Sequence, residues 1–461
     1  MSRFAACVAL LFSSVSLGLS GCDWRVEYPA VFDPNLVMTT KYEITEEIPM
    51  DQASDDSFWI VDHMFGTPDD PKIPEKITGD EDFATLLSMD RLLLASGSAE
   101  IEGRGLFRKH CVVCHGISGN GRGPTAAVQT PYPRDYRMGA FKFKSTPSGT
   151  KPTREDIARL IRHGIGGTAM LKIPELTEDD IQALVDYVIY LSIRGEHERM
   201  QIEMAMLDGV LGDGTRLLNT EFASKYLSNE KYRTYISKLE EKEEESLSES
   251  EQAELEAHEK FTEDWNYAEE YIKEIADAWL EAEEEALEVP SPPSDLPLAE
   301  SRADVDAFRA SGQAAAINAS IERGRKLFVG KVASCSKCHG KEGLGDGQTT
   351  DYDDWTKDWT LKVGIKPDER ERLVPLLARG ALSPRNAIPR NFAEGVFRGG
   401  SSSKELYRRI TQGIEGTPMP AATFVEGEFE KEDIWHIINF IRSLQNPVEP
   451  EPQPSEPTPQ A

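Results

Sequence analysis

Two copies of a Cys-x-x-Cys-His sequence constrain this chain of 461 residues more than any other feature. They are Cys111-Val112-Val113-Cys114-His115 and Cys335-Ser336-Lys337-Cys338-His339. This spacing is typical of covalent haem attachment, because two thiols one helical turn apart can each form a thioether with a haem vinyl group. The next residue then places an imidazole under the iron. The sequence therefore predicts two covalently bound haem c groups, attached through Cys111, Cys114, Cys335 and Cys338, with His115 and His339 as axial iron ligands.

Two other uses of paired cysteines fit the sequence less well. A thioredoxin-like redox pair is disfavoured because no βαβ pattern surrounds either motif. A zinc site built from both pairs is disfavoured because the pairs lie much farther apart than in zinc ribbons or fingers. Six cysteines in a chain of this length are also too few for a disulfide framework.

The N-terminus has the pattern of an export signal. Arg3 precedes a short apolar run, Ala5 to Phe12, which is too short to span a membrane. Leu19-Ser20-Gly21-Cys22 resembles a bacterial lipobox, so residues 1–21 are interpreted as a lipoprotein signal peptide and Cys22 as the lipidated residue. An ordinary signal peptide is the alternative, and export follows from both. Asp23 favours the periplasmic face of the cytoplasmic membrane over the outer membrane.

Each Cys-x-x-Cys-His motif belongs to a longer repeat. A Gly-Arg-x-Leu-Phe segment precedes the motif in both copies, beginning at Gly103 and at Gly324. Both copies end in an apolar pattern with helical spacing, from Ile181 and from Ile434. Thr177 is expected to cap the first of these helices. Between motif and closing helix, two segments recur: Pro133-Arg134-Asp135-Tyr136 with Pro389-Arg390-Asn391-Phe392, and Gly166-Gly167-Thr168-Ala169-Met170 with Glu415-Gly416-Thr417-Pro418-Met419.

With these motifs, both copies resemble class I cytochrome c domains. The resemblance implies a mostly α fold, in which two class I cytochrome c domains (92–196 and 301–446) are joined by a long acidic helical insert. It also implies that the first and last helices of each domain cross beside the haem, and that a methionine before the last helix completes the iron coordination.

The methionines at the matching places are the expected sixth ligands, with rivals in both domains. Met170 competes with Met138 and His163 in the first domain, and Met419 competes with His436 in the second. The resemblance further implies that a carbonyl near Pro124 orients His115. The second copy has no proline in that region, so its pocket is expected to depart from the pattern.

The acidic charge of the chain is concentrated between the two domains. The formal net charge is −29, and residues 240–288 hold 21 acidic and 3 basic side chains. Apolar residues recur there with helical spacing from Trp265 to Ala282. Residues 197–300 are therefore expected to form an acidic helical insert and linker, which serves either as a spacer packed on a cytochrome domain or as a docking arm for a basic partner. Residues 22–91 are expected to be an extension wrapped around the first domain, and residues 447–461 a disordered tail.

These features favour electron transfer over catalysis. Iron with histidine and methionine ligands has no open position for a substrate, so we expect a carrier between redox proteins of a respiratory chain, held to the membrane by its lipid. Nucleic acid is not an expected partner of so acidic a chain. A dihaem peroxidase, which is an enzyme and needs one haem with an openable site, is the alternative. A haem-wiring subunit of a larger respiratory complex is a further alternative.

Overall fold

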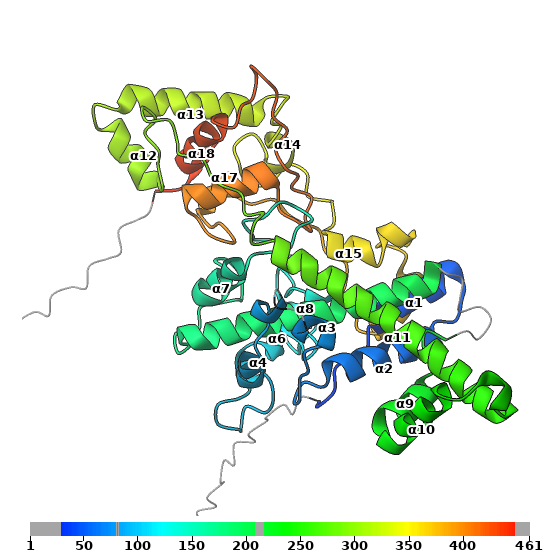
Figure 1. Cartoon of the computed structure of the whole chain (residues 1–461). Coiled ribbons are helices and arrows are strands. Elements are labelled where there is room, and N and C mark those ends of the chain that lie inside the picture. The colour runs from blue at the N-terminus through cyan, green and yellow to red at the C-terminus, as the bar shows by residue number, and fades with distance from the viewer. Residues whose placement is uncertain (1–28, 80, 82, 208–215, 448–461) are drawn as a thin grey trace, which may run out of the picture.

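The computed structural model describes residues 29–79, 81, 83–207 and 216–447, and these residues are mostly helical (Figure 1). The expected signal peptide, Cys22 and the tail from 448 lie outside the described residues. Within the described ranges there is no β-strand, only four isolated bridges. In those ranges no helix is both long and apolar enough to cross a membrane.

The first domain is built on one long helix, α8. Its other elements are shorter and lie around it, and an N-terminal extension packs against the same helix. The domain comprises α5 (Leu106–His110), α6 (Val112–His115), η2 (Ala126–Val128), η3 (Tyr136–Met138), α7 (Arg154–His163) and α8 (Glu178–Leu207). The extension comprises α1 (Leu36–Glu46), α2 (Asp51–Phe65), α3 (Glu75–Thr78), η1 (Phe83–Thr85) and α4 (Met89–Ala95).

The start of α8 and its length both follow from its sequence. Thr177 and Asp180 exchange hydrogen bonds at its start, so the expected cap is confirmed. The expected domain boundary at residue 196 falls inside the helix, which continues to Leu207. It continues because Ile202 and Ala205 extend the apolar pattern and are buried against residues of α1 and α2. The extension thus holds the last turns of α8 in place, as well as wrapping the domain.

The second domain has the helix crossing that the resemblance implies. The helix before its haem motif, α13, packs against its last helix, α18, and the two backbones approach closely at Gly324. A Cβ on Gly324 would lie 2.0 Å from the carbonyl oxygen of His436, so only glycine permits this crossing. The domain comprises α12 (Arg302–Arg309), α13 (Ala314–Val329), α14 (Ser336–His339), α15 (Asp354–Asp358), η6 (Leu361–Val363), α16 (Arg370–Ala378), η7 (Phe392–Glu394), α17 (Ser403–Gln412) and α18 (Asp433–Leu444).

The first domain does not reproduce this close crossing. Gly103, the counterpart of Gly324, has a φ of +75° and no neighbouring atom near its missing Cβ. The chain turns there, and the helix that follows is the short α5 rather than a long one. Contact with the closing helix comes instead from Phe107, whose ring centroid lies 5.0 Å from that of Tyr187.

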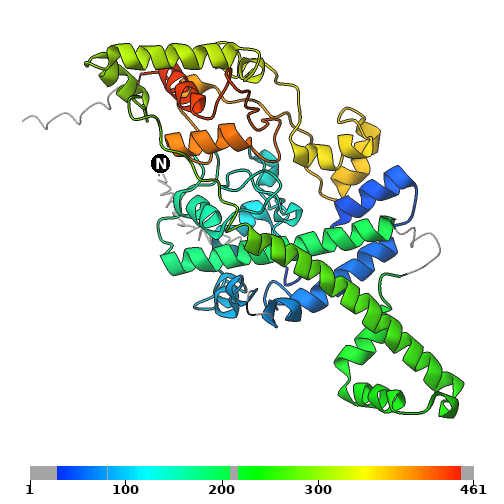
Figure 2. The ribbon, with the colours of Figure 1, turned by 45° about the horizontal axis from the view of Figure 1, so that its top comes forward.

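The acidic insert is helical, as expected, and it has two structurally different parts. It comprises α9 (Thr220–Ser228), α10 (Glu230–Glu240), η5 (Glu244–Ser246) and α11 (Glu249–Glu281). The C-terminal half of α11 packs on the first domain, where Ile272, Ile275 and Trp279 are buried. Its N-terminal half, with α9 and α10, projects from the body of the molecule (Figures 1 and 2). The packed half fits the spacer interpretation, and the projecting half carries exposed glutamates.

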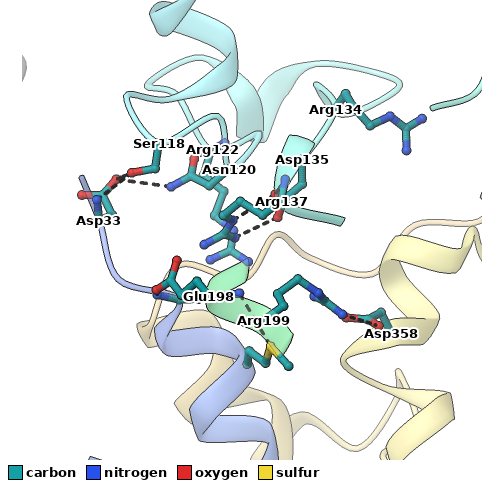
Figure 3. Close-up of polar contacts among 12 residues, drawn as sticks. Asp33, Ser118, Asn120, Arg122, Arg134, Asp135, Arg137, Glu198, Arg199 and Asp358 are labelled. Carbon is teal, nitrogen blue, oxygen red and sulfur yellow. Dashed lines mark hydrogen bonds and ion pairs between the residues drawn. The ribbon is translucent and has the colours of Figure 1, made fainter. Parts of the chain in front are cut away.

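A segment inside the second domain, residues 349–388, has no counterpart in the first and packs across onto it. Trp359, Leu373 and Leu376 form a small core with Val37 of α1. At the edge of this core, Asp358 lies within 3.4 Å of Arg199 on α8 (Figure 3). We call residues 349–388 the bridging segment, because they tie the second domain to the first.

The two cytochrome domains also meet directly. Arg159 on α7 donates to the carbonyl of Gly399 (3.0 Å) and to the carboxylate of Glu405 on α17 (2.9 Å). Arg385 of the bridging segment donates to the carbonyl of Ala127 at 2.7 Å. Charged side chains with defined partners thus fix the relative placement of the domains.

Gly324→Ala tests the close crossing of α13 and α18. The added methyl group would push the two helices apart, and overpacking of this kind costs about 1–3 kcal/mol. We expect a lower free energy of unfolding for the second domain, measured by urea denaturation of the haem-loaded protein. Gly312→Ala is the matched control, because its Cβ would meet no neighbouring atom. Equal stability of the two variants would contradict the crossing.

Candidate haem centres

The two Cys-x-x-Cys-His motifs fold alike. In each, a one-turn helix, α6 or α14, directly follows the first cysteine and is itself followed by a glycine, Gly116 or Gly340, with φ +74° and ψ 161°. A second glycine closes the loop that follows. Gly123 donates its N–H to the carbonyl of Cys114 at 3.0 Å, and Gly347 does the same to Cys338 at 3.2 Å. A Cβ on either of these two glycines would lie about 2.5 Å from a motif carbonyl, so the loop can wrap this tightly only without a side chain.

Both motifs open into one continuous cavity of about 1210 Å³. It is therefore a single space between the two domains rather than two separate pockets. Its walls include the residues predicted for haem attachment and iron ligation in both repeats, namely Cys111, Cys114, His115, Met170, Cys335, Cys338, His339 and Met419. The structure thus brings together all eight residues that the sequence predicts for the two centres.

Each motif histidine is oriented by the same hydrogen bond. The Nδ1 atom of His115 lies 3.2 Å from the carbonyl oxygen of Arg134, and that of His339 lies 3.2 Å from the carbonyl oxygen of Arg390. A carbonyl oxygen can only accept, so Nδ1 carries the proton in both rings. The Nε2 atom of each imidazole is then left with a free lone pair, which is the form that binds a metal.

This finding corrects two expectations. The partner of His115 is not a carbonyl near Pro124, because the loop around Pro124 bonds instead to the backbone of the Cys-x-x-Cys helix. The second pocket does not depart from the pattern at its histidine either. Its partner comes from the repeated Pro-Arg segment, which both copies possess, so a proline after the motif is not required.

An aromatic ring behind each histidine fixes the plane of the imidazole. Tyr136 stacks on His115 with ring centroids 4.8 Å apart, and Phe392 stacks on His339 at 4.5 Å. Each ring lies two residues after the arginine whose carbonyl accepts from the histidine, so one short stretch of chain supplies both the carbonyl and the ring.

Burial also sets the protonation state of the site. It lowers the pKa of His115 to about 4 and lowers the pKa of His339, so both imidazoles are neutral near pH 7. It raises the pKa of the Cys111 thiol to about 12 and that of Cys335 to about 11. The Cys111 and Cys335 thiols therefore stay protonated near pH 7 before haem is attached, and none of the four motif cysteines forms a disulfide.

The two methionine loops have the same backbone geometry. Ile165 donates its N–H to the carbonyl of Met170 at 2.7 Å, and Ile414 donates to that of Met419 at 3.0 Å. In each loop the threonine two residues before the methionine donates its hydroxyl to the isoleucine carbonyl at 2.7 Å. These bonds close a tight turn that holds the methionine at the cavity wall.

The rival ligands lie elsewhere. Met138 lines a smaller neighbouring cavity of about 70 Å³ and does not line the large one. His163 is exposed, and the Nδ1 atom of His436 lies 2.8 Å from the hydroxyl oxygen of Ser320. Neither histidine lines the large cavity. His110, which the sequence analysis did not consider, does line it beside the first motif.

Positive side chains outnumber acidic ones in the wall of the large cavity, where the acids among the described residues are Asp351 and Asp353. Among the described residues, Lys142 and Arg134 have no carboxylate within hydrogen-bonding distance, and the buried Nε atom of Arg398 has no partner. Figure 3 shows the Arg134 side chain pointing away from the Arg137–Asp135 pair. Burial of an unpaired charge is costly. The acidic propionates of haem would supply the missing partners, so the residues present fit this group.

Lys142 and Arg398 could have been found from the sequence. Each follows a phenylalanine at the same distance from the repeated Pro-Arg segment, as Phe141-Lys142 and Phe397-Arg398. Arg134 and Arg390 belong to the segment itself, but nothing in the sequence shows that their carbonyls face the histidines. Trp355, whose ring packs on the Arg134 guanidinium, could not be found from the repeat, because the bridging segment occurs in one copy only.

Comparison with known proteins agrees with this geometry. The cytochrome c family model matches residues 101–192 and 321–445, which lie inside the two expected domains. The chain therefore contains two cytochrome c domains, with a long helical region between them. Such domains imply covalently bound haem c and haem-based electron transfer.

Whole-chain comparison adds little. Among curated proteins, none matches the sequence. A solved structure, a chain of the Kuenenia stuttgartiensis reducing HAO-like protein complex, is similar at 21% identity with a TM-score of 0.39. The similarity covers 78% of this chain and 97% of that one.

Lys142→Met tests the unpaired charge at the cavity. Removing a nearby cation stabilises the more positive, oxidised iron, so the redox potential of a haem centre is expected to fall. Burial lowers the pKa of Lys142 to about 7, so the difference from the wild type should be present below that pH. It should shrink as the pH rises and the wild-type lysine loses its proton.

Redox titration at several pH values measures this effect. Lys404→Met is the control, because Lys404 is exposed and does not line the cavity. Potentials of Lys142→Met that equal those of the wild type at every pH would contradict a charged Lys142 at the haem.

Proposed function

We propose that the chain is a lipid-anchored dihaem c-type cytochrome that carries single electrons between redox proteins of a respiratory chain, on the periplasmic face of the cytoplasmic membrane. The observation that carries the proposal is the duplicated centre: two motifs, two carbonyl-held histidines and two matching methionine loops around one cavity. Bound haem supplies the one-electron chemistry.

The protein contributes attachment, ligation and a defined environment. The proposed roles are haem attachment by Cys111, Cys114, Cys335 and Cys338, and iron ligation by His115 with Met170 and by His339 with Met419. The Arg134 and Arg390 carbonyls hold the imidazole rings in the ligating tautomer.

The two alike methionine loops support a carrier rather than a peroxidase. A peroxidase needs one centre whose sixth position can open. Here the same two hydrogen bonds close both loops. A haem-wiring subunit of a larger complex would use the same two centres, so it differs in its partners and not in its chemistry.

Substitution of the methionines tests the proposed ligation. Met170→His and Met419→His should each lower one redox potential, because imidazole is a better donor to oxidised iron than a thioether. Each should remove about half of the sulfur-to-iron charge-transfer absorption. Stoichiometric binding of carbon monoxide to the reduced wild type would instead show an open site and favour the peroxidase.

Cys22→Ser tests the membrane anchor. The variant should keep its haem but leave the membrane fraction, because a lipidated cysteine contributes about 0.8 kcal/mol for each buried methylene group. Pro29 accepts a hydrogen bond from Arg108 beside the first motif, so an anchor at Cys22 would keep the first domain within about 25 Å of the bilayer. Retention of Cys22→Ser on membranes would contradict lipid anchoring, and wild type in outer-membrane fractions would contradict its placement.

The projecting arm formed by α9, α10 and the N-terminal half of α11 is the proposed contact for a basic redox partner. A variant with glutamine in place of five exposed glutamates would remove charge without touching the packed half of α11. The five positions are Glu243, Glu245, Glu249, Glu256 and Glu259. If the arm docks a partner, the variant should transfer electrons more slowly at low ionic strength and equally fast at high ionic strength. Parallel salt curves for variant and wild type would leave only the spacer role.

A further inference from the structure

The bridging segment touches the methionine loop of the second centre at two points. Its helix α15 begins beside that loop, and the N–H of Asp354 donates to the carbonyl of Gly416 at 3.2 Å. The edge of the Trp355 ring lies against the same residue, since a Cβ on Gly416 would be 1.8 Å from ring atom Cζ3. Gly416 lies three residues before Met419 and has a φ of +71°, so the turn and the close approach of Trp355 both require glycine there.

The other side of Trp355 contacts the first centre. The guanidinium carbon of Arg134 lies 3.4 Å from the centre of the Trp355 ring, which is a close cation–π stack. Arg134 is the residue whose carbonyl oxygen accepts the hydrogen bond from His115. A single indole therefore lies between the residue that orients one axial histidine and the loop that presents the other centre's methionine.

Trp355 is held in this place from the side of the first domain. Three residues along α15, Asp358 contacts Arg199 of α8 at 3.4 Å and Lys41 of α1 at 3.7 Å. Asp353 caps the helix by accepting from the backbone of Thr356 at 2.9 Å. These contacts hold the helix that carries Trp355 against the first domain.

The methionine loop of the first centre is contacted in turn by the second domain. Gly167, three residues before Met170 in the first domain, packs against Val396 of the second, 2.6 Å from the place of its missing Cβ. A guanidinium nitrogen of Arg390 approaches the same position at 3.9 Å. Arg390 is the residue whose carbonyl holds His339. The methionine loop of the first centre is thus supported by the second domain, and that of the second centre by the bridging segment.

We propose that Trp355 is a positioning residue shared by the two haem centres, which orients His115 through Arg134 and seats the Met419 loop through Gly416. This inference rests on the proposed His/Met ligation of both centres. It makes the ligand geometry of the two centres interdependent: a change at one indole alters both. The first repeat has no residue of this kind, because the bridging segment occurs only in the second.

Trp355→Phe in the haem-loaded full chain tests the proposal. Phenylalanine lacks the outer atoms of the indole that reach Gly416, and it offers Arg134 a smaller face. We expect the sulfur-to-iron charge-transfer absorption to weaken, by up to about half if the Met419 bond is lost, and both redox potentials to shift. Met170→His and Met419→His assign each potential to its centre.

Trp359→Phe is the matched control. Trp359 belongs to the same segment and is buried against α1, but it contacts neither Arg134 nor Gly416. The proposal predicts that both potentials shift in Trp355→Phe and that the absorption and the potentials of Trp359→Phe stay unchanged. No shift in Trp355→Phe, or a shift at one centre only, would overturn it. Absence of the absorption from the wild type would instead reject His/Met ligation, so the two failures are distinguishable.

Discussion

The hydrogen bond from the Nδ1 atom of each motif histidine to a backbone carbonyl is the interaction on which the rest of both centres depends. It selects the tautomer that leaves Nε2 free, and it joins the Cys-x-x-Cys helix to the Pro-Arg segment that also supplies the stacked ring. Because the acceptor is a main-chain atom, the two copies can differ at the following side chain, Asp135 or Asn391, and still hold the ring identically.

The common cavity explains why the two domains are joined so firmly. A cavity lined from both sides keeps its shape only if both walls stay in register, and here ion pairs and the bridging segment hold them. Few carboxylates balance the cations at the cavity wall: among the described residues that line it, the acids are Asp351 and Asp353. The desolvation of the cations would be offset by a ligand that carries carboxylates, and this charge balance connects the fold with its cofactor.

The sequence predicted the features that recur most plainly in the two copies, but it missed Lys142 and Arg398, which recur as well. Two motifs, two methionines and two closing helices recur at matching places, so the mostly α architecture and the predicted attachment and ligand residues followed directly. The carbonyl partner of His115 could not be predicted, because a backbone acceptor has no side chain to mark it, and the expected position near Pro124 was wrong. The long course of α8 and the role of Trp355 depend on contacts between distant segments, which periodicity does not encode.

Mass spectrometry of the matured protein and its proteolytic peptides measures the central claim most directly. The account predicts two haem-modified peptides, one carrying Cys111 and Cys114 and the other carrying Cys335 and Cys338, with no unmodified form of either in the loaded protein. An intact mass that includes one haem or none, or a haem peptide from any other part of the chain, would contradict the duplicated centre.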